Sequence, residues 1–204
     1  MNQVEQDQIK SLIRSIPDFP EAGVVFRDIT TALKDAEGLR IIMDDFVERY
    51  KDKHIDYVLG ADARGFIFGA ALAYAIGAGF VPARKPGKLP AEAVSVSYDL
   101  EYGSNSIEVH KDAFTKGDNV LVIDDLLATG GTAKAMTELV EALGAHVYEL
   151  AFMIELADLG GRDILKEYDV YSQFCESLFW KCTYEKEFHI DLVFNLFYKI
   201  SVKF

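Results

Sequence analysis

The chain has few cysteines, and its basic residues are outnumbered by acidic ones. The two cysteines, Cys175 and Cys182, lack the further ligands of a zinc site, and we interpret them as reduced thiols of a cytoplasmic protein. The 21 lysines and arginines face 33 aspartates and glutamates, which gives a net charge of -12. This charge argues against a nucleic-acid partner, which requires a basic face, but it does not exclude a basic pocket for a polyphosphate.

Long apolar runs are also absent. No run reaches the length that spans a membrane, and residues 1–10 are too polar and acidic for a signal peptide, so we expect no membrane partner. We find no internal repeat and no low-complexity linker. With 204 residues and 50% hydrophobic content, the chain can bury a sizeable core as one domain.

The most informative segment is Val120–Thr132. Its first four residues are apolar and mostly β-branched, which predicts a strand covered on both faces. Asp124 and Asp125 follow where we expect the strand to end, and the small and hydroxyl-bearing residues 128–132 lead into a helix predicted over 133–143. Such a loop lets backbone N–H groups and the helix dipole meet an anion. We therefore predict a phosphate-binding loop beside two carboxylates, which suit sugar hydroxyls or Mg²⁺.

Two common nucleotide-binding motifs are excluded. Thr132 follows Gly131 where a nucleoside-triphosphatase loop requires lysine, and no G-x-G-x-x-G motif follows the strand. A site for one phosphate beside a diol-binding acidic pair suggests a ribose 5-phosphate. The segment closely resembles the signature of the phosphoribosyltransferases, which bind phosphoribosyl pyrophosphate. The alternative is an ordinary strand, turn and helix with solvated aspartates, but the tight spacing of acids, small residues and hydroxyls favours the resemblance.

An irregular segment near the N-terminus suggests the acceptor base. Two prolines and a glycine interrupt residues 17–29, and residues 24–26 are extended and apolar. Phe26 could complete the core or stack on an aromatic base. The segment resembles the adenine phosphoribosyltransferases almost residue for residue. The resemblance implies that the backbone at Val25 and Arg27 recognises the edge of adenine and that Phe26 lies on its face. An amide offers one donor and one acceptor, which suits this edge.

A second strand, loop and helix are predicted over residues 55–76. In the loop, Arg64 and the amides around Gly65 come at a helix N-terminus, which suits an anion. The phosphoribosyltransferases have a similar loop that holds pyrophosphate. The resemblance implies this role for Asp62, Ala63 and Arg64, and a cis peptide bond between Asp62 and Ala63. A surface ion pair is the alternative for Arg64.

Three cations lie close together after a strand predicted over 79–83. Arg84, Lys85 and Lys88 stand out in a chain this acidic. A charge run is usually a solvated face, but this one follows a strand end, where the other ligand loops also lie. We interpret Arg84 and Lys88 as pyrophosphate contacts.

Residues 94–110 alternate between apolar and polar side chains on both sides of a turn at 101–105, which predicts a β-hairpin. Without a flanking core it would be marginally stable, as a mobile lid over substrate would be. Residues 100–103 match the lid of the adenine phosphoribosyltransferases. The resemblance implies that Glu101 shares a proton with N7 of the purine and that Tyr102 covers the reacting centre. Without the resemblance, Glu101 would be taken for a surface residue.

The remaining predictions complete the domain. Further helices are expected over 4–15, ended by Pro17, over 39–51 and over 67–76, and a further strand over 145–154. The resemblance implies that Leu159 closes the second face of the adenine slot, although ordinary core packing is the alternative. It covers the chain to about residue 174, so we expect one domain over 1–174, with a hood from 15–32 and 155–174 and a lid at 94–110. The aromatic-rich residues 175–204 form an extension to which we assign no function.

The predicted fold is an α/β, type I phosphoribosyltransferase fold: a parallel sheet flanked by helices, with a small hood and a flexible β-hairpin lid. The implied reaction joins adenine to phosphoribosyl pyrophosphate and yields AMP and pyrophosphate, with Mg²⁺ bound by Asp124 and Asp125 directly or indirectly. The catalytic candidates are Glu101, Tyr102 and Arg64. The phosphoribosyl-pyrophosphate site comprises Asp62, Ala63, Arg64, Arg84, Lys88, Asp124, Asp125, Ala128, Thr129, Gly130, Gly131 and Thr132. A homodimer is expected from the resemblance alone. The alternatives are transfer to another purine base, or a non-catalytic protein that binds phosphoribosyl pyrophosphate.

Overall fold

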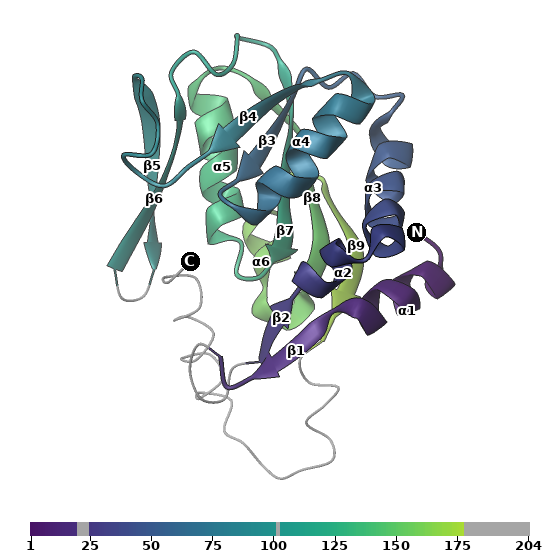
Figure 1. The fold of residues 1–204 in the computed structure, drawn as a ribbon. Coiled ribbons are helices and arrows are strands. Elements are labelled where there is room, and N and C mark those ends of the chain that lie inside the picture. The colour runs from purple at the N-terminus through teal and green to yellow at the C-terminus, as the bar shows by residue number, and fades with distance from the viewer. Residues whose placement is uncertain (20–24, 101–102, 178–204) are drawn as a thin grey trace. The chain divides into compact units, whose positions relative to one another are not determined.

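The computed structural model describes residues 1–19, 25–100 and 103–177, which are drawn in colour in Figure 1. Within them, residues 1–42 and 43–177 form two compact units, which are described separately below. In the described part of the chain, no helix is both long enough and apolar enough to cross a membrane.

The first unit contains a short antiparallel pair of strands between helices. Its elements are α1 (Gln3–Leu12), β1 (Arg14–Pro17), β2 (Val25–Asp28), α2 (Thr30–Lys34) and the beginning of α3 (Ala36–Tyr50). The expected helix over 4–15 was wrong at its end, because Ile13 is extended and Arg14 pairs with Asp28 across the two strands. The extended stretch expected around residue 25 is confirmed as β2.

The second unit is built on a parallel five-stranded sheet with the order β4-β3-β7-β8-β9. The strands are β3 (Tyr57–Ala61), β4 (Gly79–Ala83), β7 (Asn119–Leu127), β8 (His146–Leu156) and β9 (Val170–Glu176), and the helices are α4 (Arg64–Ile76), α5 (Gly131–Ala142), the 3-10 turn η1 (Ala157–Leu159) and α6 (Gly161–Ile164). The predicted parallel sheet is confirmed. Strand β9 continues past the domain boundary expected at residue 174.

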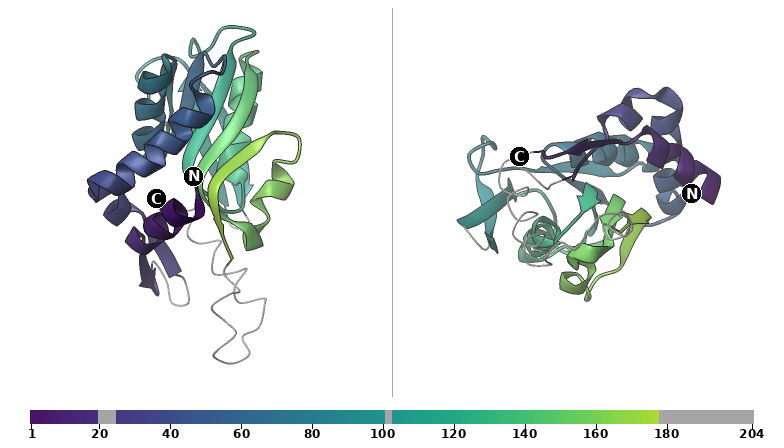
Figure 2. Two further views of the ribbon diagram at one scale, coloured as in Figure 1. Left: turned by 90° about the vertical axis from the view of Figure 1, so that its right-hand side faces the viewer. Right: turned by 90° about the horizontal axis from the view of Figure 1, so that it is seen from below.

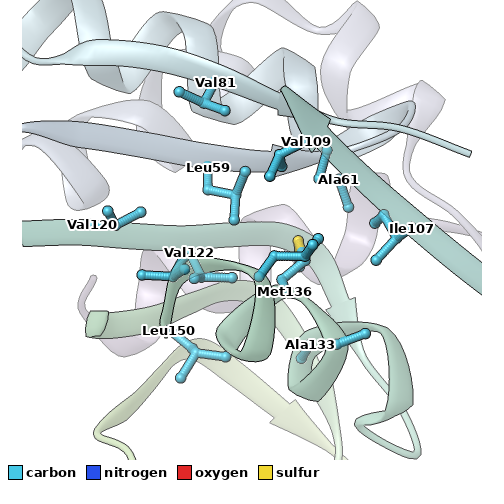
Figure 3. Close-up of a cluster of buried hydrophobic side chains, with 14 of the residues drawn as sticks. Leu59, Ala61, Val81, Ile107, Val109, Val120, Val122, Ala133, Met136 and Leu150 are labelled. Carbon is cyan, nitrogen blue, oxygen red and sulfur yellow. The ribbon is translucent and has the colours of Figure 1, made fainter. Parts of the chain in front are cut away.

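Helices cover both faces of this sheet (Figure 2). Successive residues of a strand point to opposite faces. On β7, Val122 joins the buried cluster that contains Met136 of α5 (Figure 3). On the opposite face, a Cβ added at Gly69 of α4 would lie 3.1 Å from Cγ2 of Ile123, so this helix packs directly against the strand. Burial on both faces explains why the start of β7 is continuously apolar.

The order of the strands places a topological switch point between β3 and β7. From β3 the chain moves outward to β4 on one side and then returns to β7 on the other, so the direction of the connections reverses between these two strands. In open α/β sheets, ligands bind outside the carboxyl ends of the strands at such a switch point.

The two aspartates of the signature segment lie within β7 rather than after it. Pairing between β3 and β7 stops at Ile123, whereas β8 accompanies β7 as far as Leu127. The expectation that the strand ends before Asp124 was therefore wrong, because β8 keeps the backbone extended through Asp124 and Asp125. Both residues lie beyond the last pair of residues between β3 and β7, on the carboxyl side of the switch point.

The predicted hairpin is confirmed as β5 (Ala93–Leu100) and β6 (Gly103–His110). The expected turn over 101–105 was too long, because Asn105 already pairs with Tyr98. One face of the hairpin packs on the second unit: Ile107 and Val109 of β6 are buried in the same cluster as Met136 of α5 (Figure 3). The hairpin was expected to lack a flanking core, and this was wrong for its base, which packs on the buried cluster.

Candidate active site

An ion pair joins the two sides of the switch point. Arg64, the first residue of α4, places Nε 2.6 Å from Oδ2 of Asp125 on β7. The Asp125 side chain is only 5% exposed, and that of Arg64 is 38% exposed. A simple surface ion pair, the alternative considered for Arg64, is therefore excluded. The pair brings the loop after β3 against the acidic end of β7.

The adjacent carboxyl groups hold their protons more tightly than isolated ones. Burial raises the pKa of Asp124, and the neighbouring charge of Asp125 raises it further. Burial also raises the pKa of Asp125, which the guanidinium of Arg64 opposes. The N–H of Asp125 donates to Oδ1 of Asp124 at 2.9 Å. The alternative of ordinary solvated aspartates does not hold for Asp125, which is 4% exposed. Asp125 is buried and Asp124 is half-buried, so charge on this acidic pair calls for a cation or for hydroxyl donors.

The loop after β3 also organises the basic segment after β4. Arg84 Nε donates to Oδ2 of Asp62 at 3.0 Å, and Nη1 donates to the carbonyl oxygen of Lys88 at 3.3 Å. The Asp62 carboxylate thus holds a cation of the next loop. The Lys88 side chain is exposed, and the peptide bond between Asp62 and Ala63 is cis, as the resemblance implied.

Two helices that begin beside the switch point have N-cap residues without a capping side chain. Helix α1 has a complete capping box, in which Asn2 and Glu5 satisfy each other's backbone N–H groups. By contrast, the N-cap residues of α4 and α5, Ala63 and Gly130, make no side-chain capping hydrogen bond. The first N–H groups of a helix have no partner inside it, so these two ends are suited to bind anions.

The predicted phosphate-binding loop packs against the turn at residues 160–161, which the sequence did not single out. A Cβ added at Gly161 would overlap the carbonyl oxygen of Ala128, and one added at Gly130 would lie 2.8 Å from the carbonyl oxygen of Gly161. Gly130 also has a positive φ of 86°, which favours glycine. The loop can approach the 160–161 turn this closely only because glycines lie on both sides. The two pairs of adjacent glycines, 130–131 and 160–161, are the feature of the sequence that could have indicated this contact.

The turn at residues 160–161 is held by an ion pair between Arg162, which is exposed, and Glu155, which is buried. Glu155 accepts from Arg162 Nε at 2.9 Å and from Nη2 at 2.6 Å, and it also accepts from Ser172 Oγ at 2.8 Å. The hydrogen bonds from Arg162, followed by the one from Ser172, lower the pKa of Glu155. Arg162 Nη1 donates to the Val170 carbonyl at 2.9 Å. This network ties the turn to β8 and β9. None of its side chains was predicted as a site residue.

A tyrosine of the hairpin also reaches the loop and was not predicted as a site residue. The hydroxyl oxygen of Tyr98 lies 3.1 Å from Oγ1 of Thr132, so a hydrogen bond links β5 to the first turn of α5.

The residues expected around adenine belong to different parts of the structure. In the first unit, Phe26 packs edge-to-face on Phe19 with ring centroids 5.3 Å apart, Val25 is exposed, and Arg27 Nη1 donates to the Ser15 hydroxyl. In the second unit, Leu159 is half-buried in η1, which does not match a fully buried core residue. Glu101 and Tyr102 lie outside the described residues, as do residues 20–24 of the expected hood and residues 178–204 of the extension.

The donor set fits magnesium held partly by substrate. Among the described residues, no group of three or more His, Cys, Asp or Glu side chains could hold a metal alone. Mg²⁺ is usually bound through one or two carboxylates together with substrate phosphates and water. Asp124 and Asp125, which lie beside the start of α4, meet this requirement.

Comparisons with known proteins agree with this site. Residues 30–186 match the phosphoribosyl transferase domain family. An adenine phosphoribosyltransferase of Clostridium botulinum is 58% identical over 164 residues, which cover 80% of this chain and 95% of that protein. The adenine phosphoribosyltransferase structure from Thermoanaerobacter pseudethanolicus is 49% identical with a TM-score of 0.81, covering 83% of this chain and 99% of that one.

The structure of a Saccharomyces cerevisiae relative contains adenine and an imino-altritol bisphosphate. It is 38% identical with a TM-score of 0.79, and the match covers 85% of this chain and 100% of that one. Extensive identity, the matching family and the shared fold together lead to one conclusion: this chain belongs to the adenine phosphoribosyltransferase family, within the type I phosphoribosyltransferases.

Proposed function

We propose that this chain transfers the phosphoribosyl group of phosphoribosyl pyrophosphate to N9 of adenine, giving AMP and pyrophosphate, in purine salvage. The observation that carries the proposal is the Arg64–Asp125 ion pair at the switch point of the sheet. Arg64 begins α4, and the loop after β7 leads into α5; neither helix has a capping side chain at its N-cap residue. Two helix N-termini together with an acidic pair suit a sugar that carries a phosphate at one end and a pyrophosphate at the other.

The proposed placement of phosphoribosyl pyrophosphate follows from these features. Residues 128–132 hold the 5-phosphate through the start of α5. Asp124 and Asp125 receive the ribose hydroxyls, directly or through magnesium. The loop that contains Arg64, together with the basic segment that Arg84 organises, holds the pyrophosphate. Magnesium, when bound, neutralises charge that develops on the departing pyrophosphate.

Catalysis in this placement requires no protein nucleophile. The transition state of the transfer has oxocarbenium character, so the protein must hold the ribose, stabilise the leaving group with cations and orient N9 for attack. Backbone groups at Val25 and Arg27 read the adenine edge, and Phe26 and Leu159 contact its two faces. Glu101 shares a proton with N7, and Tyr102 covers the reacting centre.

The direct test is product formation with Mg²⁺, phosphoribosyl pyrophosphate and adenine, hypoxanthine or guanine in parallel. We expect AMP from adenine and little product from the other bases. Turnover with hypoxanthine or guanine instead would point to a different acceptor base. Tight binding of phosphoribosyl pyrophosphate without turnover of any base would overturn the enzymatic function.

Glu101 has its own test, because its role rests on the resemblance alone. Glu101→Gln keeps the size of the side chain but cannot exchange a proton at N7. We expect kcat to fall by about 100-fold or more, the lower range for a general acid or base, with little change in the affinity for ribose 5-phosphate. An unchanged kcat would remove Glu101 from the catalytic residues.

We also propose that the protein forms a homodimer through α4. Ile67 and Tyr74 are seven positions apart on one face of this helix, with exposed fractions of 45% and 91%. Ala70 and Ala71 extend the same exposed apolar face. In a symmetric dimer, the same face of a second copy would pack on this apolar face and bury it. The proposed compartment is the cytoplasm, where the thiol of Cys175, which forms no disulfide in the described part of the chain, stays reduced.

A further inference from the structure

Tyr98 brings the hairpin into contact with the phosphate-binding loop. Val94, Val96 and Tyr98 alternate along one face of β5, and all three pack against the buried cluster. Tyr98 lies further along β5 than the two valines. Its ring lies against the start of α5: a Cβ added at Gly131 would be 3.3 Å from Tyr98 Cδ2 and 3.6 Å from Cε2. The absence of a side chain at Gly131 therefore makes room for the aromatic ring.

The Tyr98 hydroxyl then reaches the next residue of the loop. Its oxygen is 3.1 Å from Oγ1 of Thr132, and either hydroxyl could donate in this geometry. The separation is somewhat longer than the 2.7–2.8 Å typical of hydroxyl pairs, which leaves room for the bond to shorten. The Tyr98 side chain is half-buried, and its hydroxyl contacts a side chain that belongs to the proposed 5-phosphate site.

A bound phosphate would decide the direction of this hydrogen bond. Each hydroxyl has one proton to donate and can accept through its lone pairs, whereas phosphate oxygens act mainly as acceptors. If Thr132 gives its proton to a phosphate, its oxygen can still accept, and Tyr98 is the neighbour able to donate to it. The two hydroxyls then form a chain that runs from Tyr98 through Thr132 to the phosphate. Such chains polarise each member and strengthen the terminal bond.

We propose that Tyr98 is a positioning residue for the 5-phosphate of phosphoribosyl pyrophosphate and of AMP, acting by orienting the Thr132 hydroxyl. The inference rests on the proposed function for the assignment of residues 128–132 to the 5-phosphate. It adds a residue from the hairpin to the binding of the ribose phosphate. It also predicts a selective effect, because the loops assigned to pyrophosphate do not contact Tyr98 in any described hydrogen bond.

The test uses Tyr98→Phe, which keeps the ring against Gly131 and removes only the hydroxyl. Dissociation constants are measured by calorimetry for ribose 5-phosphate, AMP and magnesium pyrophosphate. We expect the constants for ribose 5-phosphate and AMP to rise about 5- to 10-fold, the loss of one hydrogen bond, and that for magnesium pyrophosphate to change less than 2-fold. The KM for phosphoribosyl pyrophosphate should rise with them, while the KM for adenine and the melting temperature stay nearly constant.

A double-mutant cycle shows whether Tyr98 acts through Thr132. In a Thr132→Ala background, Tyr98→Phe should weaken ribose 5-phosphate binding by less than 2-fold, because the group it orients is gone. Tyr168→Phe is the matched control. It removes another tyrosine hydroxyl at α5, one that donates to Glu141 at 2.8 Å, and it should leave ribose 5-phosphate binding unchanged.

Several outcomes would overturn the inference: no effect of Tyr98→Phe on ribose 5-phosphate, an equal loss for magnesium pyrophosphate, or the full effect in the Thr132→Ala background. These outcomes are independent of catalysis. If the protein binds ribose 5-phosphate and shows the selective Tyr98 effect but transfers nothing to adenine, the proposed reaction fails and the positioning role stands. If AMP is formed and Tyr98→Phe binds like the unchanged protein, only the positioning role fails.

Discussion

Arg64 Nε lies 2.6 Å from Oδ2 of Asp125, and this pair connects the start of α4 to β7 across the switch point of the sheet. The carboxylate is almost fully buried, whereas the guanidinium is partly exposed toward solvent. The fold thereby holds one cation directly against the acidic pair at the switch point.

Asp125→Asn should impair the use of phosphoribosyl pyrophosphate. Asparagine keeps the size of the side chain but leaves Arg64 without its charged partner and removes one acid from the ribose and magnesium site. A charge-assisted hydrogen bond contributes about 1.5–3 kcal/mol, so we expect kcat/KM for phosphoribosyl pyrophosphate to fall by about 10- to 100-fold. Steady-state kinetics at saturating adenine measure this.

The matched control for Asp125→Asn is Glu149→Gln, which breaks a similar arginine pair elsewhere in the second unit. Glu149 accepts from Arg49 Nε at 2.9 Å and is buried. This variant should lower the melting temperature and leave kcat/KM nearly unchanged. Equal kinetic losses in the two variants would mean that Asp125 acts only through stability.

Gly161→Ala should displace the proposed phosphate-binding loop, residues 128–132, by a steric clash. The added methyl group would overlap the carbonyl oxygen of Ala128, so the loop must move. We expect the free energy of unfolding to fall by about 1–3 kcal/mol, and the KM for phosphoribosyl pyrophosphate to be higher than that of the unchanged protein.

The control is Gly117→Ala, which introduces backbone strain without a steric clash. Gly117 has a φ of 94° but open space around its Cβ position. It should cost about 1 kcal/mol with no change in KM. A normal KM in Gly161→Ala would contradict this account of the loop.

Asp28 should make the stability of the first unit depend on acid pH. Hydrogen bonds from the Thr30 hydroxyl and from Arg14 lower the pKa of Asp28 to about 2 from 3.8. The folded state thus favours the charged carboxylate, so its stabilisation is full above about pH 4 and is lost as the pH falls toward 2. Because the Arg14 side chain is 59% exposed, we expect only about 1–2 kcal/mol.

The corresponding variant is Asp28→Asn, compared with the unchanged protein by urea unfolding between pH 7 and pH 2. The difference in unfolding free energy should be largest near neutral pH and should close below pH 3. Thr30→Ala removes the hydrogen bond that lowers the Asp28 pKa most. In this variant, the stabilisation by Asp28 should therefore be lost at a higher pH than in the unchanged protein. A difference that is constant across the whole range would show that Asp28 contributes by packing alone.

Ile67→Glu and Tyr74→Glu should break the proposed dimer. Each places a charge on the exposed apolar face of α4, where burial against a second copy would leave it unpaired. Light scattering coupled to size-exclusion chromatography should report a dimer for the unchanged chain and a monomer for the variants. Val4→Glu changes an exposed apolar residue of α1, with an exposed fraction of 77%, and should leave the dimer intact. A monomeric unchanged chain, or a dimer in both α4 variants, would rule out this interface.

Local patterns in the sequence were sufficient to predict the signature segment and the elements around it. The apolar run at Val120 predicts a strand buried on both faces, and the small residues before α5 predict an anion site. Both follow from neighbouring residues alone. The roles of Val25, Phe26, Arg27, Leu159, Glu101 and Tyr102 came from family resemblance rather than from chemistry visible in the pattern, and they stay predictions.

Only the tertiary structure decided how these pieces meet. Residues far apart in the chain form the pairs Arg64–Asp125, Asp62–Arg84 and Tyr98–Thr132, and no local periodicity encodes a partner. The extension of β7 through its aspartates depended on pairing with β8, and the end of α1 depended on pairing with β2. Short-range preferences set which segments become strands or helices, but the length of each element and the partners of each charged group depend on the strands and loops that pack beside them.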